Sequence, residues 1–171
     1  MSLRGISKVG EIVDLLTNET VKEAFAAFGI ARAIDPAPDG SVNLDNLSGV
    51  AFEKVIADLL DRIGFQTELT KASGDGGIDI IATLDRTIFG GRYLFQCKRF
   101  AHDSLVGAPT LRDFYGAVTA DRAVKGVFIT TSGFTVQARE FGERVGLELI
   151  DAEKLETLMS EYGVADRTKL P

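Results

Sequence analysis

The chain has 171 residues, 45% of them apolar and 26% charged, a composition typical of one globular domain with a small appendage. Because no apolar run is long enough to span a bilayer and no basic-then-apolar leader opens the chain, we expect no membrane anchor and a cytoplasmic location. The net charge of −6 argues against a nucleic-acid partner, and the single Cys97 excludes an internal disulfide.

The charge is unevenly distributed along the chain. Residues 86–125 contain seven basic and three acidic side chains, an excess of four positive charges. Binding to a polyanion depends on the local field more than on the total charge, so this segment keeps a nucleic-acid partner open. The alternative is scattered, solvated charge.

Residues 1–43 are predicted to form a helical appendage that ends in a linker. Apolar residues recur at helical spacing up to about residue 32, and residues 34–41 hold two prolines and a glycine. Nothing in this segment indicates chemistry. The domain that matters for function is therefore predicted to span residues 44–171.

The clearest helix is predicted from Leu47 to Ile63. Its apolar residues form one continuous stripe: Phe52, Val55, Ile56, Leu59, Leu60 and Ile63. Glu53 lies at the edge of that stripe, where the helix meets a sheet, and Gly64 ends the helix.

The remaining elements alternate between strands and helices. Strands are expected over 65–69, 79–84, 92–99, 124–130 and 147–150, and helices over 111–118, 136–145 and after Asp151. A turn at 88–91 makes the second and third strands an antiparallel pair. The order α-β-β-β-α-β-α-β-α predicts an α/β fold, with a mixed sheet covered by helices on both faces.

Three polar residues stand at the ends of two predicted strands. Asp79 follows a glycine-rich turn, while Gln96 and Lys98 lie two apart and share one face of their strand. Asp79 and Gln96 offer oxygen ligands to a divalent cation, and Lys98 offers a charge to a phosphate. The alternatives are an ordinary strand-end aspartate and a lysine that extends into solvent.

Several motifs together resemble the Mrr-type branch of the restriction-endonuclease-like nucleases, the PD-(D/E)xK superfamily. The resemblance spans roughly Asn46 to Met159. It rests on Glu53, Gly74-Asp75-Gly76-Gly77-Ile78-Asp79, Gln96-Cys97-Lys98, Leu111–Gly116, Gly126–Thr135 and Leu149-Ile150-Asp151. It implies a restriction-endonuclease-like αβββαβ core flanked by helices, in agreement with the order of elements above.

The resemblance also implies Mg²⁺-dependent cleavage of DNA, with Mn²⁺ as a substitute. By motif position Asp79 is the metal-binding acid and Lys98 the catalytic lysine. Gln96 takes the position that is Asp or Glu in most of the superfamily but Gln in this branch. Glu53 matches the helix-borne acid, so the expected catalytic set is Glu53, Asp79, Gln96 and Lys98, and all of these except Lys98 are expected to contact the metal.

Other polar residues are assigned by charge and position. Arg99 and Arg112 are expected to contact the DNA backbone. The hydroxyls of residues 130–132 either bind phosphate or cap the next helix. Cys97 points away from Gln96 and is expected to be a small buried residue, and His102 is expected to be a solvated loop residue.

The expected function is a metal-dependent endodeoxyribonuclease that restricts foreign or modified DNA. Two alternatives stay open: a structure-specific repair nuclease that uses the same residues, and a catalytically idle DNA-binding module. The expected partners are DNA and a second copy of the chain. The described motifs include no base-reading module, so a separate specificity partner is also considered.

Overall fold

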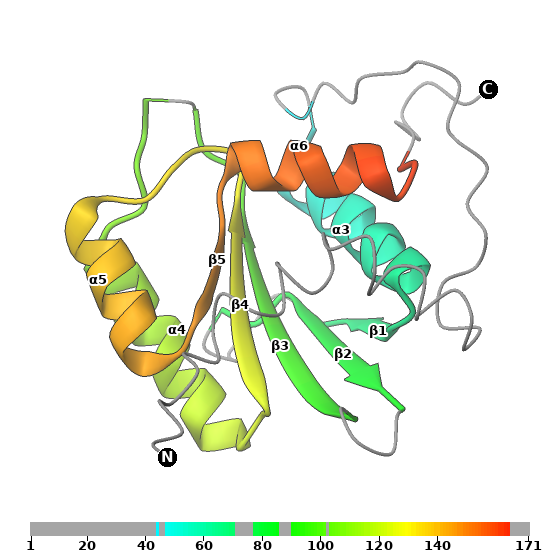
Figure 1. The fold of residues 1–171 in the computed structure, drawn as a ribbon, viewed down its shortest axis with the longest axis horizontal. Helices are drawn as coiled ribbons and strands as arrows, with labels where there is room; N and C mark the ends of the chain where they lie inside the picture. Colours follow the sequence, from blue (N-terminus) through cyan, green and yellow to red (C-terminus); the bar gives the residue numbers. More distant parts are fainter. Residues whose placement is uncertain (1–43, 45–46, 71–76, 86–89, 102, 165–171) are drawn as a thin grey trace, which may run out of the picture.

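The computed structural model of the chain describes residues 44, 47–70, 77–85, 90–101 and 103–164, which form nine helices and strands (Figure 1). The elements are α3 (Gly49–Ile63), β1 (Gln66–Leu69), β2 (Ile80–Leu84), β3 (Gly91–Lys98), α4 (Ala108–Asp121), β4 (Lys125–Thr130), α5 (Val136–Val145), β5 (Glu148–Ile150) and α6 (Ala152–Glu161). This order confirms the predicted one. None of the helices in these ranges is long and apolar enough to cross a bilayer.

One mixed sheet of five strands runs through the centre of the domain, in the order β1-β2-β3-β4-β5. β1, β2 and β3 pair antiparallel, while β3–β4 and β4–β5 pair parallel. In the parallel part, α4 and α5 each connect one strand to the next, as parallel pairing requires. β3 and β4 therefore end at the same edge of the sheet, with Lys98 opposite Thr130.

Helices cover both faces of the sheet, as predicted. α3 and α6 lie on one face and α4 and α5 on the other (Figure 1). Along β3, Tyr93, Phe95 and Cys97 belong to the α3–α6 core, whereas Leu94 belongs to the α4–α5 core. By this alternation Gln96 and Lys98 project from the face of Leu94.

Each predicted helix and strand is present, with bounds that differ by up to three residues, as in α4, which was expected over 111–118 and spans Ala108–Asp121. β2 begins at Ile80 and not at Asp79. β4 begins at Lys125, and Val124 is 61% exposed although its β-branched side chain suggested a buried strand residue. Val124 lies just before the strand, where its N–H donates to the carbonyl of Arg92 (2.8 Å).

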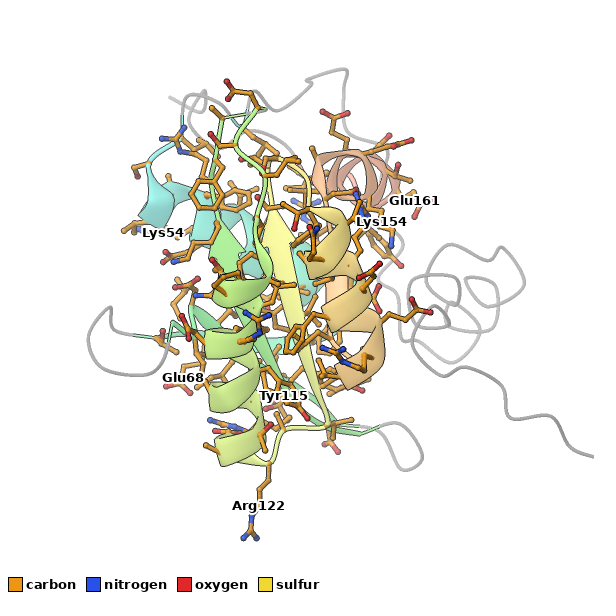
Figure 2. All side chains as sticks on the ribbon, turned by 90° about the vertical axis from the view of Figure 1, so that its left-hand side faces the viewer. Lys54, Glu68, Tyr115, Arg122, Lys154 and Glu161 are labelled. Atoms are coloured by element: carbon orange, nitrogen blue, oxygen red, sulfur yellow. The ribbon has the colours of Figure 1, made fainter. Side chains whose placement is uncertain are left out.

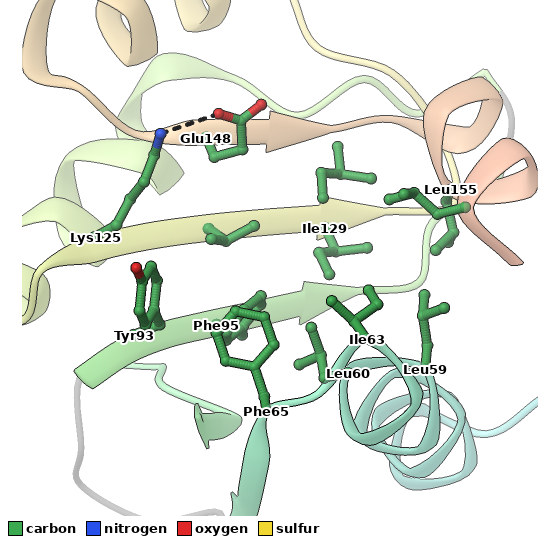
Figure 3. A pocket seen from close by; sticks show the side chains of 13 residues that line it. Leu59, Leu60, Ile63, Phe65, Tyr93, Phe95, Lys125, Ile129, Glu148 and Leu155 are labelled. Carbon is green, nitrogen blue, oxygen red and sulfur yellow. Dashed lines mark ion pairs between the residues drawn. The ribbon is translucent and has the colours of Figure 1, made fainter. Parts of the chain in front are cut away.

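A cavity of about 50 Å³ lies on the α3–α6 side of the sheet (Figure 3). Its walls are mostly apolar, and an ion pair between Lys125 Nζ and Glu148 Oε2 (3.2 Å) occupies one end. None of the predicted site residues lines it. The cavity is therefore separate from the predicted site.

Some predictions fall outside the described residues. They concern the appendage at residues 1–43, most of the glycine-rich turn at 71–76, the hairpin turn at 86–89 and His102. The division of the chain at residue 43 stays a prediction.

Candidate active site

Asp79 is held between two strands. Its N–H donates to the carbonyl of Phe95 (2.9 Å), and its own carbonyl accepts from the N–H of Thr70 (3.0 Å). Its carboxylate Oδ2 accepts the N–H of Cys97 (2.7 Å). The Cys97 N–H of β3 thus binds the side chain of Asp79 and not a backbone carbonyl, and the regular pairing of β2 with β3 begins at Ile80. The same bond aims the carboxylate at β3 between Gln96 and Lys98.

Gln96 is a buried amide with an unpaired oxygen. The residue is 6% exposed, and its Oε1 accepts no hydrogen bond from the described part of the chain. A buried carbonyl-type oxygen without a donor is costly, by about 1–3 kcal/mol. Such an atom is suited to a ligand that needs an oxygen donor.

Gly77 provides the space for the Gln96 amide. Its φ of +82° favours glycine, and a Cβ at this position would lie 2.2 Å from Gln96 Nε2. Gly77 is thus a position at which only glycine fits beside the Gln96 amide. It brings the backbone against a side chain of the candidate site.

Glu53 is close enough to Asp79 and Lys98 for their charges to act on it. Burial of its carboxyl group raises its pKa, the negative charge of Asp79 raises it further, and Lys98 counteracts both. Charged groups from α3, from the residue just before β2 and from the end of β3 are therefore close enough to interact. Lys98 is half-buried in this arrangement.

Cys97 is buried on the α3–α6 face of β3, opposite to the face from which Gln96 and Lys98 project. Burial raises the pKa of its thiol well above the ordinary range, and Asp79 and Glu53 raise it further. A thiol kept protonated is a poor nucleophile and metal ligand. This confirms the prediction of a small buried residue.

The donor set fits a hard divalent cation. Within the described ranges, no three His, Cys, Asp or Glu side chains gather closely enough to hold a metal by themselves. Asp79 and Glu53 supply two carboxylates, and the unpaired Gln96 Oε1 adds a neutral oxygen. Two carboxylates with further oxygen ligands and water suit Mg²⁺ better than a cage of soft ligands.

The described basic residues of 86–125 do not gather on one surface, which agrees with the alternative of scattered charge. Arg92 pairs with Asp121 (2.8 Å) and Lys125 is buried against Glu148. Arg122 projects from the far end of α4, away from the end of the sheet at which β3 finishes (Figure 2).

The two arginines predicted to bind DNA differ in their surroundings. Arg99 is exposed and directly follows Lys98, so it adjoins the candidate site. Arg112 is also exposed, but its guanidinium lies over the ring of Phe141 on α5, 5.7 Å from the ring centroid. Its position on the α4–α5 layer makes it a candidate for a peripheral contact.

The hydroxyls at the end of β4 have a role that the sequence did not indicate. Thr131 Oγ1 accepts the N–H of Phe100 (2.9 Å) and donates to the carbonyl of the same residue (2.8 Å). Helix α5 is capped by Thr135, whose Oγ1 accepts the N–H of Ala138 (3.2 Å). The expectation that residues 130–132 cap the next helix is therefore wrong.

Known proteins with similar sequences and folds include restriction enzymes. Residues 44–159 match the Mrr_cat family, described as restriction endonuclease. The type IV methyl-directed restriction enzyme EcoKMrr of Escherichia coli (strain K12) is 42% identical over 133 residues, which are 73% of this chain and 43% of that enzyme. The chain thus spans less than half the length of this curated relative.

Two solved structures share the fold. The protein of unknown function AF1548 superposes with a TM-score of 0.61 at 21% identity, over 72% of this chain and 71% of that one. The DNA modification-dependent restriction endonuclease AspBHI superposes with a TM-score of 0.53 at 16% identity, over 97% of this chain and 38% of that one. Since the family match covers more than half of its residues, the chain belongs to the Mrr_cat restriction endonuclease family.

Proposed function

We propose that the chain is a metal-dependent endodeoxyribonuclease that hydrolyses phosphodiester bonds of foreign or modified DNA. The observation that carries this proposal is the buried, unpaired oxygen of Gln96, two residues before Lys98 on the strand that also binds the Asp79 carboxylate. If residue 96 had no function, an apolar side chain at this buried position would make the fold more stable.

Mg²⁺, or Mn²⁺ in its place, would be held by Asp79, Glu53 and Gln96. When bound, such an ion polarises a phosphoryl oxygen and lowers the pKa of its water. Asp79 is suited to this role because the Cys97 N–H fixes its orientation (2.7 Å). Burial raises the pKa of Glu53 and the negative charge of Asp79 raises it further; a bound cation would counteract both effects.

Lys98 would act on the phosphate and the attacking water. Its ammonium group carries three donors and a full charge, so it can neutralise a phosphate oxygen and orient a water molecule at once. Arg99 directly follows it, is exposed, and would bind a neighbouring phosphate.

The names of the relatives favour modified DNA as the substrate. EcoKMrr is described as methyl-directed and AspBHI as modification-dependent. This chain matches less than half of either protein, so reading of the modification would reside in a separate specificity partner or region. A homodimer, acting in the cytoplasm, would place two such sites on the two strands of a duplex.

The test is cleavage of supercoiled plasmid, methylated and unmethylated, with Mg²⁺ or Mn²⁺. We expect metal-dependent nicking or linearisation that Lys98→Ala abolishes. Arg122→Asn is the matched control, because it removes one positive charge at the far end of α4 and Asn tolerates the positive φ of 60° there.

Other outcomes separate the alternatives. Cleavage that survives in Lys98→Ala would show that the centre is misassigned. Preference for branched over linear duplexes would favour the repair nuclease. DNA binding without cleavage of any substrate would identify an idle module.

A further inference from the structure

The hydroxyl of Thr131 makes two hydrogen bonds to Phe100, which lies just beyond the end of β3. A threonine hydroxyl has one donor and two acceptor positions. In Thr131 the donor binds the carbonyl of Phe100 (2.8 Å), and an acceptor position receives the N–H of Phe100 (2.9 Å). Thr131 is 2% exposed, so water does not compete for these bonds.

The two bonds continue the pairing of β3 with β4 past its last step. The register ends with Lys98 opposite Thr130, and the N–H of Thr131 donates to the carbonyl of Lys98 (3.3 Å). The side chain of Thr131 then binds both polar groups of Phe100, as a neighbouring strand residue does. Thr131 thus binds Lys98 through its N–H and Phe100 through its hydroxyl, and Arg99 lies between these two residues.

The position of the Lys98 backbone depends on these hydrogen bonds, because Lys98 is the last residue of β3. The last residues of a strand have fewer backbone hydrogen bonds and open more readily than the core. The ammonium group stands at the end of a four-carbon stem, so a small backbone rotation moves it far. A misplacement of about 1 Å at a reacting centre can cost roughly a hundredfold in rate.

The neighbouring hydroxyls bind elsewhere. Ser132 Oγ donates to the carbonyl of Ser104 (2.9 Å), and Thr130 Oγ1 lies 3.1 Å from Ser132 Oγ. They hold a later part of the β3–α4 connection, which projects beyond the end of the sheet (Figure 1). Among the three hydroxyls, that of Thr131 alone binds Phe100, two residues after Lys98.

We propose that Thr131 is a positioning residue of the nuclease site: its hydroxyl fixes the end of β3 and thereby the placement of Lys98 and Arg99. This inference rests on the proposed function. The hydroxyl of Thr131 binds Phe100 and none of the proposed metal ligands. Its removal should therefore lower kcat and leave the binding of Mg²⁺ unchanged.

The test compares Thr131→Val, which keeps the shape and removes both bonds, with Thr131→Ser, which keeps the hydroxyl. We expect Thr131→Val to lower kcat for plasmid cleavage about 10- to 100-fold and to raise the KM for DNA by a smaller factor, through Arg99. Thr131→Ser should retain most of the activity. Thr119→Val is the control, because Thr119 is exposed on α4 and donates to the carbonyl of Tyr115 (2.9 Å).

A second measurement reports on the bonds themselves. Amide hydrogen exchange of Phe100 should be faster in Thr131→Val and close to normal in Thr131→Ser. Unchanged exchange in Thr131→Val, or full cleavage by it, would overturn the positioning role and leave the nuclease proposal standing. An unaltered chain that cleaves no substrate would overturn the nuclease proposal and the positioning role with it.

Discussion

If the amide oxygen of Gln96 binds the metal, the Mg²⁺ affinity should depend on the charge of residue 96. Replacing the amide by a carboxylate in Gln96→Glu adds one negative charge beside the proposed cation. We expect Mg²⁺ affinity to rise roughly tenfold, equivalent to about 1.4 kcal/mol, as measured by isothermal titration. Without metal, the buried carboxylate should lower the melting temperature.

The matched control for this change is Gln66→Glu. Gln66 is exposed and pairs with Thr83, at the end of the β1–β2 pair away from Asp79. It adds the same charge without adding a ligand, so Mg²⁺ affinity should stay unchanged. Equal or weaker binding by Gln96→Glu would contradict a direct contact between residue 96 and the metal.

Glu53 should make stability depend on pH in the absence of metal. Because its pKa is raised in the folded state, its carboxyl group stabilises the fold when protonated, and this stabilisation is lost as pH rises through the folded pKa. Glu53→Gln should therefore melt at a higher temperature than the unaltered chain at pH 7 in a chelator. The difference should close below about pH 4, under the ordinary pKa of glutamate.

Thermal melts across pH test this, with Glu68→Gln as the control. Glu68 is exposed on β1 (Figure 2), so its replacement should change the melting temperature little at any pH. A melting temperature of Glu53→Gln at or below that of the unaltered chain at pH 7 would contradict a raised pKa of Glu53 in the folded state. Added Mg²⁺ should stabilise the unaltered chain more than Glu53→Gln.

At the scale of the elements, the buried pair of Lys125 and Glu148 links β4 to β5. Both side chains are less than a tenth exposed. Lys125→Met should destabilise the fold by up to about 3–5 kcal/mol, because it removes the nearer cation of the buried Glu148 carboxylate and leaves the exposed Lys154, whose Nζ is 4.0 Å from Oε1. The double change Lys125→Met with Glu148→Met should recover most of that loss, since replacing both charges by apolar groups is often neutral.

Urea unfolding measures both changes, with Arg92→Met as the control. Arg92 pairs with Asp121 at the surface, where its side chain is 46% exposed, so its loss should cost no more than about 1 kcal/mol. A double variant as unstable as Lys125→Met would show that the pair does more than neutralise charge.

The elements were predictable where local periodicity determines them. The stripe from Phe52 to Ile63 predicts α3, and the β-branched run that ends at Thr130 predicts β4. Lys125 was not predictable as a buried residue, because its partner Glu148 comes from a later strand. Thr131 was missed for the same reason: its bonds reach Phe100, which is 31 residues away in sequence.

At the scale of the whole molecule, some arginines among the described residues are paired with acidic residues and others are not, and this difference predicts which of them bind DNA. Arg112 is exposed without an acidic partner in the described residues, whereas Arg92 is already paired with Asp121. If Arg112 binds a phosphate, Arg112→Ala should weaken binding and reduce the slope of log affinity against log salt by about 0.9. Arg92→Ala should change the slope little.

Fluorescence anisotropy on a labelled duplex over a salt series measures both slopes. The slope measured for the unaltered chain gives the number of its phosphate contacts. A small number would mean that this acidic chain binds DNA through a few local positive charges. An unchanged slope in Arg112→Ala would remove Arg112 from the interface and leave the role of Arg99 to be tested in the same way.

The strand order of the sheet also has a consequence for synthesis. Because the order β1-β2-β3-β4-β5 is the order along the chain, each strand pairs with the one that left the ribosome just before it. None of these five described strands has to wait for a partner encoded much later, and pairings close in sequence form quickly. The helix that follows each parallel strand covers it in turn, so folding that keeps pace with translation leaves little strand edge open to other nascent chains.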